Sequence, residues 1–143
     1  MGLVGVCLAL LGAASAGADS GTAAGKPVFI PVQQFTLAWI HTIEKVRWEE
    51  DYAIDAVEDD AVLKAVAARV RGSAAGMEPP SDARLRSGWY SYTPQISQPK
   101  VLRLMRSGFA ADYEFCSGGR CRPMSYFLPS DGGITLLTAC QIN

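Results

Sequence analysis

The stretch WEEDYAIDAV, residues 48–57, alternates between apolar and acidic side chains. Successive side chains of a β-strand point to opposite faces of a sheet, so one face of this stretch is mainly apolar and the other is acidic. The first face carries Trp48, Glu50, Tyr52 and Ile54, and the second carries Glu49, Asp51 and Asp55. The pattern predicts a half-buried antiparallel strand whose polar side faces water.

Residues 35–41 (FTLAWIH) repeat this alternation one short connection earlier in the chain, so the two stretches are expected to pair as a hairpin. Shorter strands are expected wherever apolar segments are separated by Gly and Pro clusters, at 88–92, 100–106, 112–116, 122–128 and 134–138. Many short strands of this kind predict one all-β domain, either an antiparallel sandwich or a partly open barrel.

Residues 61–71 fit two structures. Val62, Val66 and Val70 recur every four residues in an Ala-rich stretch, and the preceding Asp59 and Asp60 are suited to cap a helix. The same residues, read with a period of two, line one side of a long strand. Intrinsic propensity favours the helix, and the residues alone leave both structures open.

The N-terminus has the pattern of a secretory signal. Residues 3–11 are apolar, and Ala14-Ser15-Ala16 and Ala16-Gly17-Ala18 fit the small-x-small cleavage pattern, although no Lys or Arg precedes the apolar stretch. We therefore expect a cleaved signal peptide at 1–18, a small-residue linker at 19–27 and a β domain at 28–143. Such a protein is periplasmic or otherwise exported, and would meet the membrane only through its signal peptide or a partner.

Cysteine positions suggest a disulfide in the exported domain. Cys116 and Cys121 flank Ser-Gly-Gly-Arg, which is typical of a hairpin tip, so their thiols are expected to face each other. A bond from Cys140 to one of them is the alternative. One His and three such cysteines do not have the spacing of a zinc site, so neither a metal nor a cofactor is expected.

The charge distribution argues against nucleic-acid binding. The formal net charge is −1, and no basic domain is present. Acidic residues concentrate between residues 44 and 60, whereas basic residues predominate from Arg69 onward. We favour an attraction between two halves of one sheet over a charged binding surface.

Titratable groups concentrate between residues 41 and 50. In the predicted hairpin, His41 lies near Trp48 and Glu50 on the apolar face, where an imidazole and a carboxylate would stabilise each other's charged forms. Such a pair can act in proton transfer or bind a ligand, and it can equally be structural. Arg106 is a further candidate, because it could neutralise Glu50 from a neighbouring strand. The candidate ligand-binding patch comprises His41, Thr42, Glu44, Lys45, Glu50 and Arg106, with no residue assigned to catalysis.

The chain resembles the DUF1850 family, an uncharacterised bacterial group of small exported domains, from about residue 35 to 140. The resemblance is carried by FTLAWIHTIEKVRWEED (35–51), RGSAAGMEPP (71–80), RSGF (106–109) and CSGGRCRP (116–123). Two positions depart from the family pattern. Thr42 stands where Ser is common, and Ala74-Ala75 stands where a Gly-containing stretch is common.

The resemblance implies an all-β domain, so we assign residues 61–71 to a strand. It also implies an association with tripartite ATP-independent periplasmic (TRAP) transporters, particularly those with TAXI-type solute receptors, and it implies no activity. The expected function is a periplasmic accessory or ligand-binding module whose partners are transporter subunits or a small carboxylated solute. The alternative is a small hydrolase or metal-dependent enzyme that uses His41 with Glu44 or Glu50.

Overall fold

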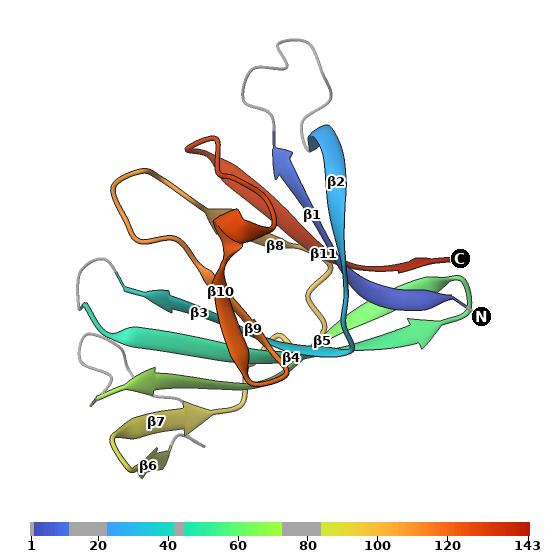
Figure 1. Cartoon of the computed structure of the whole chain (residues 1–143). Coiled ribbons are helices and arrows are strands. Elements are labelled where there is room, and N and C mark those ends of the chain that lie inside the picture. The colour runs from blue at the N-terminus through green and yellow to red at the C-terminus, as the bar shows by residue number, and fades with distance from the viewer. Residues whose placement is uncertain (1, 12–22, 42–44, 73–83) are drawn as a thin grey trace.

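The structure of the protein is a computed structural model that describes residues 2–11, 23–41, 45–72 and 84–143. These residues form eleven strands and one three-residue 3-10 helix, η1 (Met124–Tyr126). All strand pairs are antiparallel and the strands form two sheets, which confirms the predicted all-β sandwich (Figure 1). Neither sheet closes into a barrel.

The seven-stranded sheet has the strand order β10-β9-β3-β4-β5-β7-β6. Its strands are β3 (Gln34–Ile40), β4 (Arg47–Val57), β5 (Asp60–Arg71), β6 (Arg84–Arg86), β7 (Trp89–Tyr92), β9 (Glu114–Ser117) and β10 (Arg120–Pro123). The four-stranded sheet has the order β2-β1-β11-β8. Its strands are β1 (Leu3–Leu11), β2 (Ala23–Pro31), β8 (Leu102–Met105) and β11 (Ile134–Ile142).

The β3–β4 hairpin forms with the predicted faces. Phe35 pairs with Tyr52, Leu37 with Glu50 and Trp39 with Trp48, so the apolar residues of the two strands share one face of the sheet. This face packs against the four-stranded sheet, and we call it the inner face; the opposite face is the outer face. The core joins both sheets and includes Val6, Leu8, Leu104 and Leu137 from one and Phe35, Leu37, Tyr52, Ile54, Leu63 and Phe115 from the other.

Strand β5 resolves the ambiguity at residues 61–71 in favour of the strand. Asp51 pairs with Ala67 and Tyr52 pairs with Ala65, so Val66 is an extra residue at a β-bulge and is 55% exposed. The bulge changes which residues point inward, because Leu63 is buried before it and Ala68 and Val70 after it. The valines at every fourth position therefore do not share one buried face, and pairing with β4 and β7 overrides the helical propensity.

The fold begins earlier than the expected boundary at Val28. Strand β1 is paired on both sides, with β2 and with β11 (Figure 1). Its Val6 and Leu8 are fully buried. Strand β2 starts at Ala23, inside the segment expected to be a linker. An apolar run of nine residues suits a signal peptide and a buried strand equally well, and this explains the difference. Cleavage of residues 1–18 stays a prediction, and it would remove all of β1 from the domain.

Two disulfides are present, Cys116–Cys121 as expected and Cys7–Cys140, which was not expected. The second ties β1 to β11 across a sequence separation of 133 residues, whereas the first spans only 5. By the loop-entropy argument the long-range bond contributes about 5 kcal/mol and the short one about 2 kcal/mol. Cys140 therefore does not compete for Cys116 or Cys121, because its partner lies in the N-terminal strand.

The expected strand at 122–128 is shorter than predicted. Strand β10 ends at Pro123, and the chain turns into η1, where the backbone N–H groups of Phe127 and Leu128 both donate to Met124 O. Met124 is fully buried at this turn. The apolar residues of 124–128 thus enter the core from a turn, where strand alternation does not apply.

Candidate functional site

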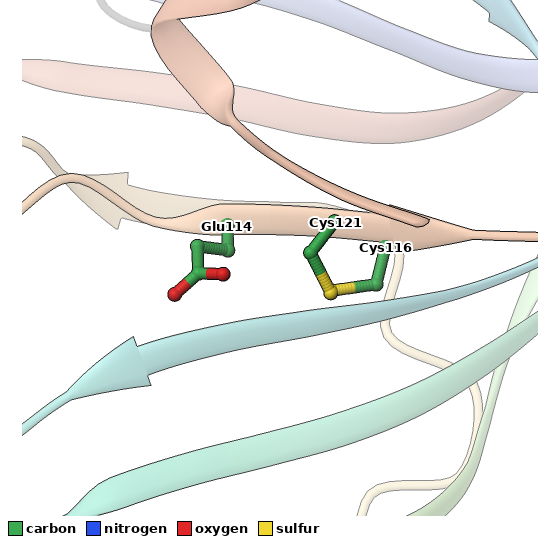
Figure 2. A group of neighbouring side chains, drawn as sticks. All are labelled: Glu114, Cys116 and Cys121. Carbon is green, nitrogen blue, oxygen red and sulfur yellow. A yellow bond between two sulfur atoms is a disulfide. The ribbon is translucent and has the colours of Figure 1, made fainter. Parts of the chain in front are cut away.

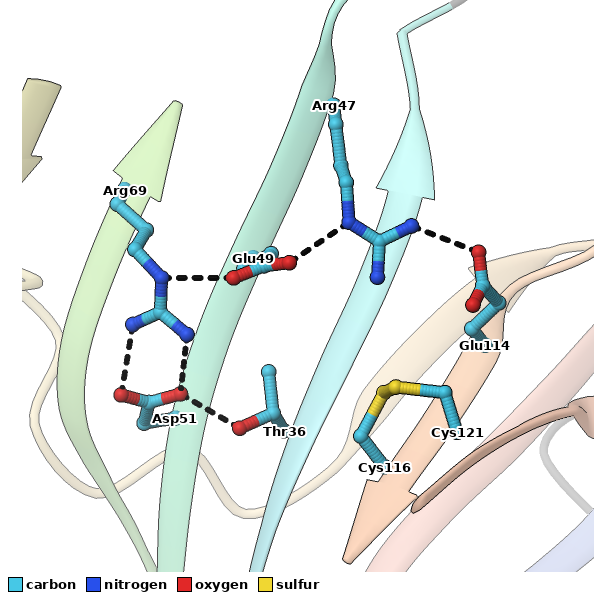
Figure 3. The surroundings of a disulfide bond; sticks show 8 residues. All are labelled: Thr36, Arg47, Glu49, Asp51, Arg69, Glu114, Cys116 and Cys121. Carbon is cyan, nitrogen blue, oxygen red and sulfur yellow. Dashed lines mark hydrogen bonds and ion pairs between the residues drawn. A yellow bond between two sulfur atoms is a disulfide. The ribbon is translucent and has the colours of Figure 1, made fainter. Parts of the chain in front are cut away.

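The outer face of the seven-stranded sheet carries a row of alternating charges (Figure 3). Arg69 donates to Glu49 at 2.7 Å and to Asp51 at 2.8 Å, and Arg47 donates to Glu49 and to Glu114, each at 2.7 Å. The row crosses strands β5, β4 and β9. It confirms that acidic and basic segments attract each other within one sheet.

Asp51 is held in its charged form within this row. Burial acts to raise the pKa of its carboxyl, but hydrogen bonds from Arg69 and from the Thr36 hydroxyl, with the charge of Arg69, bring the pKa below its ordinary value. The hydrogen bond to Asp51 correspondingly raises the pKa of the Arg69 guanidinium. These side chains satisfy one another, which is typical of structural ion pairs.

The Cys116–Cys121 disulfide lies on the same face, beside Glu114 (Figures 2 and 3). The two cysteines are directly paired across β9 and β10, and the hairpin tip between them has positive φ at Gly118 (59°) and Gly119 (79°). Glu114 and the two sulfur atoms are close enough together to hold a metal ion. However, a disulfide supplies no thiolate, so the oxidised site is a structural cross-link.

The inner face holds a cleft of about 610 Å³ between the sheets. Its floor is formed by β4, β5 and β7, and its wall is the segment 93–103, which crosses from β7 to β8 (Figure 1). The lining is mainly apolar and aromatic, with Tyr52, Tyr92, Pro94, Ile96, Pro99 and Val101 among its residues. Among the described residues, Glu50 is the acidic residue and Arg103 the basic residue that line the cleft.

Glu50 lies among tyrosines. The Tyr52 hydroxyl donates a hydrogen bond to Glu50 Oε1 at 2.6 Å. Burial, together with the charge of Glu50, raises the pKa values of Tyr52, Tyr92 and Tyr113 above their ordinary range. These phenols therefore stay neutral and can act as hydrogen-bond donors at physiological pH.

His41 and Glu50 lie on the same face, as predicted, but at different places. The His41 ring stacks against Trp48 with 5.9 Å between ring centroids, at the end of the hairpin. Glu50 pairs with Leu37, which lies four residues before His41 in the chain. The positions of His41 and Glu50 are therefore about 13 Å apart along the strand. His41 therefore contacts Trp48 at the end of the hairpin, whereas Glu50 lines the cleft.

The other candidate residues are spread over the molecule. Lys45 is exposed in the β3–β4 turn with a φ of 57°, and its backbone N–H donates to His41 O. Thr42 and Glu44 lie outside the described residues. Tyr92 and the 93–103 segment were missed as cleft residues, since nothing in their sequence indicates that this connection folds back over β4.

Arg106 has a different carboxylate partner from the one expected. Its side chain is 1% exposed and binds both carboxylate oxygens of Asp112, at 2.9 and 3.0 Å. It also donates to Thr135 Oγ1 and to Leu128 O. Arg106 therefore joins β8, β11 and the segment before β9 inside the protein, and it does not neutralise Glu50.

The described residues include no helix with the length and apolarity that crossing a membrane requires. No curated protein and no solved structure matches this chain. The family model DUF1850, "Domain of unknown function (DUF1850)", matches residues 35–124, a segment that runs from β3 through β10 to the start of η1. The match includes the Glu50 cleft and leaves out β1, β2 and β11. Because the match covers more than half of the 143 residues, the protein belongs to the DUF1850 family.

Proposed function

We propose that this protein is an exported ligand-binding module that serves a transport system and holds a small solute in the Glu50 cleft. The observation that carries the proposal is the cleft itself, which combines an apolar, aromatic lining with one carboxylate. Its volume of about 610 Å³ lies in the range typical of small-molecule sites, which are mostly apolar with a few polar groups that orient the ligand.

The Cys116–Cys121 disulfide supports the location, because disulfides form and persist in oxidising compartments such as the bacterial periplasm. Cys7–Cys140 adds to this support where β1 is retained, since cleavage of residues 1–18 would remove Cys7. The link to a transporter of the TRAP type rests on the family resemblance. No enzymatic role is proposed: His41 and Glu50 are about 13 Å apart along the hairpin, and Glu44, the other acid suggested to act with His41, lies outside the described residues.

Solute binding is tested by calorimetric titration of the purified, oxidised protein with a panel of small cationic, neutral and anionic solutes. We expect at least one solute to bind saturably, and Tyr92→Ala to weaken that binding, because Tyr92 lines the cleft. Tyr126→Ala is the matched control, since Tyr126 is 62% exposed on η1 and does not line the cleft. Equal loss in both variants would show that binding occurs elsewhere.

The transport role is tested separately by co-purification from native membranes. We expect the tagged protein to retain the solute receptor or the membrane subunit of a TRAP-type system. Failure to retain either, with solute binding intact, would remove the transport role and keep the ligand-binding module.

A further inference from the structure

The acidic residues of β4 differ in how they are neutralised. Glu49 and Asp51 are paired with arginines on the outer face, and Asp55 is paired with Lys64 at 2.5 Å. Glu50 has no Lys or Arg partner among the described residues, and its hydrogen bond comes from the neutral hydroxyl of Tyr52. Of the carboxylates on this strand, the one in the cleft is thus the one without a cation.

Arg103 lines the same cleft from an exposed position of β8, but no ion pair between Arg103 and Glu50 is present among the described residues. The segments outside the description, 12–22, 42–44 and 73–83, contain neither Lys nor Arg. Apart from Lys26, which belongs to β2 in the other sheet, every basic residue of the chain has a described side chain. Arg106, the buried candidate, is fully engaged by Asp112, Thr135 and Leu128.

The charged form of a half-buried carboxylate in an apolar cleft is poorly stabilised, because it has lost part of its hydration. Removing its hydration without a compensating cation is unfavourable, so a positively charged ligand gains more here than a neutral ligand of the same shape. Tyr52 and Tyr92 line the same space, and aromatic rings attract cations. The apolar residues Ile96 and Val101 would contact the uncharged part of such a ligand.

We propose that the cleft binds a small organic cation, an ammonium group attached to an apolar body, with Glu50 as its counter-ion. This inference rests on the proposed function, because it takes the cleft to be the ligand site. A divalent metal is a poorer fit, since such ions take several oxygen ligands and the cleft lining includes one carboxylate. At Glu50 itself a carboxylated solute is also a poorer fit, because Glu50 repels a negative charge.

The experiment uses three probes of nearly equal shape: benzylamine, benzyl alcohol and benzoate. They are titrated by calorimetry into the oxidised wild-type protein, Glu50→Gln and Glu58→Gln. Glu50→Gln keeps an oxygen that accepts from Tyr52 and removes the charge. Glu58→Gln removes the same charge from an exposed turn between β4 and β5 and is the matched control.

We expect the wild type and Glu58→Gln to bind benzylamine at least about tenfold more tightly than benzyl alcohol, and benzoate least tightly. Glu50→Gln should lose about tenfold or more in benzylamine affinity and keep its benzyl alcohol affinity. Benzylamine binding should also weaken as sodium chloride is added, since salt screens the ion pair.

Four outcomes would overturn the inference. The first is equal affinity for benzylamine and benzyl alcohol, and the second is unchanged benzylamine binding by Glu50→Gln. In the third, benzoate binds most tightly; if Tyr92→Ala weakens that binding, the cleft remains the ligand site and only the ligand class is wrong. Absence of saturable benzylamine binding at millimolar concentration overturns the inference as well, and the wider solute panel then decides separately whether the cleft binds ligands.

Discussion

The two faces of strand β4 treat acidic side chains in opposite ways. On the outer face, Glu49 and Asp51 share Arg69, and each of their carboxylates is bonded within the sheet. On the inner face, Glu50 is bonded only to a phenol and borders an open cleft. Glu49 and Glu50 are adjacent in the sequence and identical in chemistry, so their roles differ only because the strand turns them to opposite faces.

This difference separates charges that serve the fold from a charge available for binding. A buried or half-buried charge that the protein neutralises itself is weak evidence for function. A charge left without a cation in a cleft lowers stability or contributes nothing to it, and such sites are where local rules of folding are most often broken for function. The following predictions test this contrast, from the largest expected effect to the smallest.

Arg106→Ala tests the most buried pair and should be the most damaging change. It leaves Asp112 without its cation and leaves Thr135 Oγ1 and Leu128 O without a donor. We expect a loss of about 3–5 kcal/mol in the free energy of unfolding, measured by urea denaturation. Arg103→Ala, at an exposed position of β8 three residues before Arg106, should change it by less than about 0.5 kcal/mol. Similar losses in both variants would contradict the role of the Arg106–Asp112 pair.

Arg69→Ala tests the outer row, which is half-buried. We expect a loss of about 1–2 kcal/mol in unfolding free energy, because two carboxylates lose one shared cation. This value lies between those typical of exposed ion pairs and of buried ion pairs. Lys64→Ala removes a pair whose side chains are about half exposed, and it should cost less than about 1 kcal/mol. A Lys64 effect as large as that of Arg69 would mean that the row adds nothing beyond isolated surface pairs.

Lowering the pH should destabilise the protein, because it protonates the paired carboxylates Asp51 and Asp112. Asp112 resembles Asp51: burial acts to raise its pKa, but hydrogen bonds and charge from Arg106, with backbone N–H groups of Tyr113 and Ser125, bring it below the ordinary value of 3.8. A carboxyl with a lowered pKa in the folded state stabilises the fold above its unfolded pKa, and this contribution is lost as the pH falls through the folded pKa.

We therefore expect stability to change little through these groups between pH 7 and pH 5, and to fall below about pH 4. Thermal unfolding followed from pH 7 to pH 2.5 measures this. Asp112→Asn should be less stable at neutral pH and should show a shallower decline in acid. A decline in Asp112→Asn as steep as that in the wild type would exclude Asp112 from the acid response.

Glu50→Gln should have the smallest effect on stability. No internal cation is lost and the Tyr52 hydroxyl keeps an acceptor, so the unfolding free energy should change by less than about 0.5 kcal/mol, or increase slightly. Urea denaturation measures this beside Arg69→Ala. A decrease of more than about 1 kcal/mol in the unfolding free energy would show that Glu50 stabilises the fold, and it would contradict the contrast between the two faces.

The cleft was only partly predictable. Alternation in residues 48–57 places Glu50 on the apolar face, and the structure confirms this. The same alternation places His41 on that face but does not say how far along it the two residues lie. Arg106 was proposed as the cation for Glu50, and its partner is Asp112, six residues away in the segment before β9. Which charges meet depends on how β8 and β9 are arranged, and that arrangement has no local signal.

The sequence by itself determined the β3–β4 hairpin and the two faces of β4, and it predicted the Cys116–Cys121 bond with a bond to Cys140 as the alternative. Each depends on residues close together in the chain, through the period of two along a strand or the short turn that joins two strands. Only the tertiary structure decided that Leu3–Leu11 is a central strand bonded through Cys7 to Cys140 and that residues 61–71 form a bulged strand. It also decided that Glu50 forms no ion pair with a Lys or Arg of the described residues. The physical reason is that these features depend on contacts between distant segments, which the local pattern of apolar and charged residues leaves undetermined.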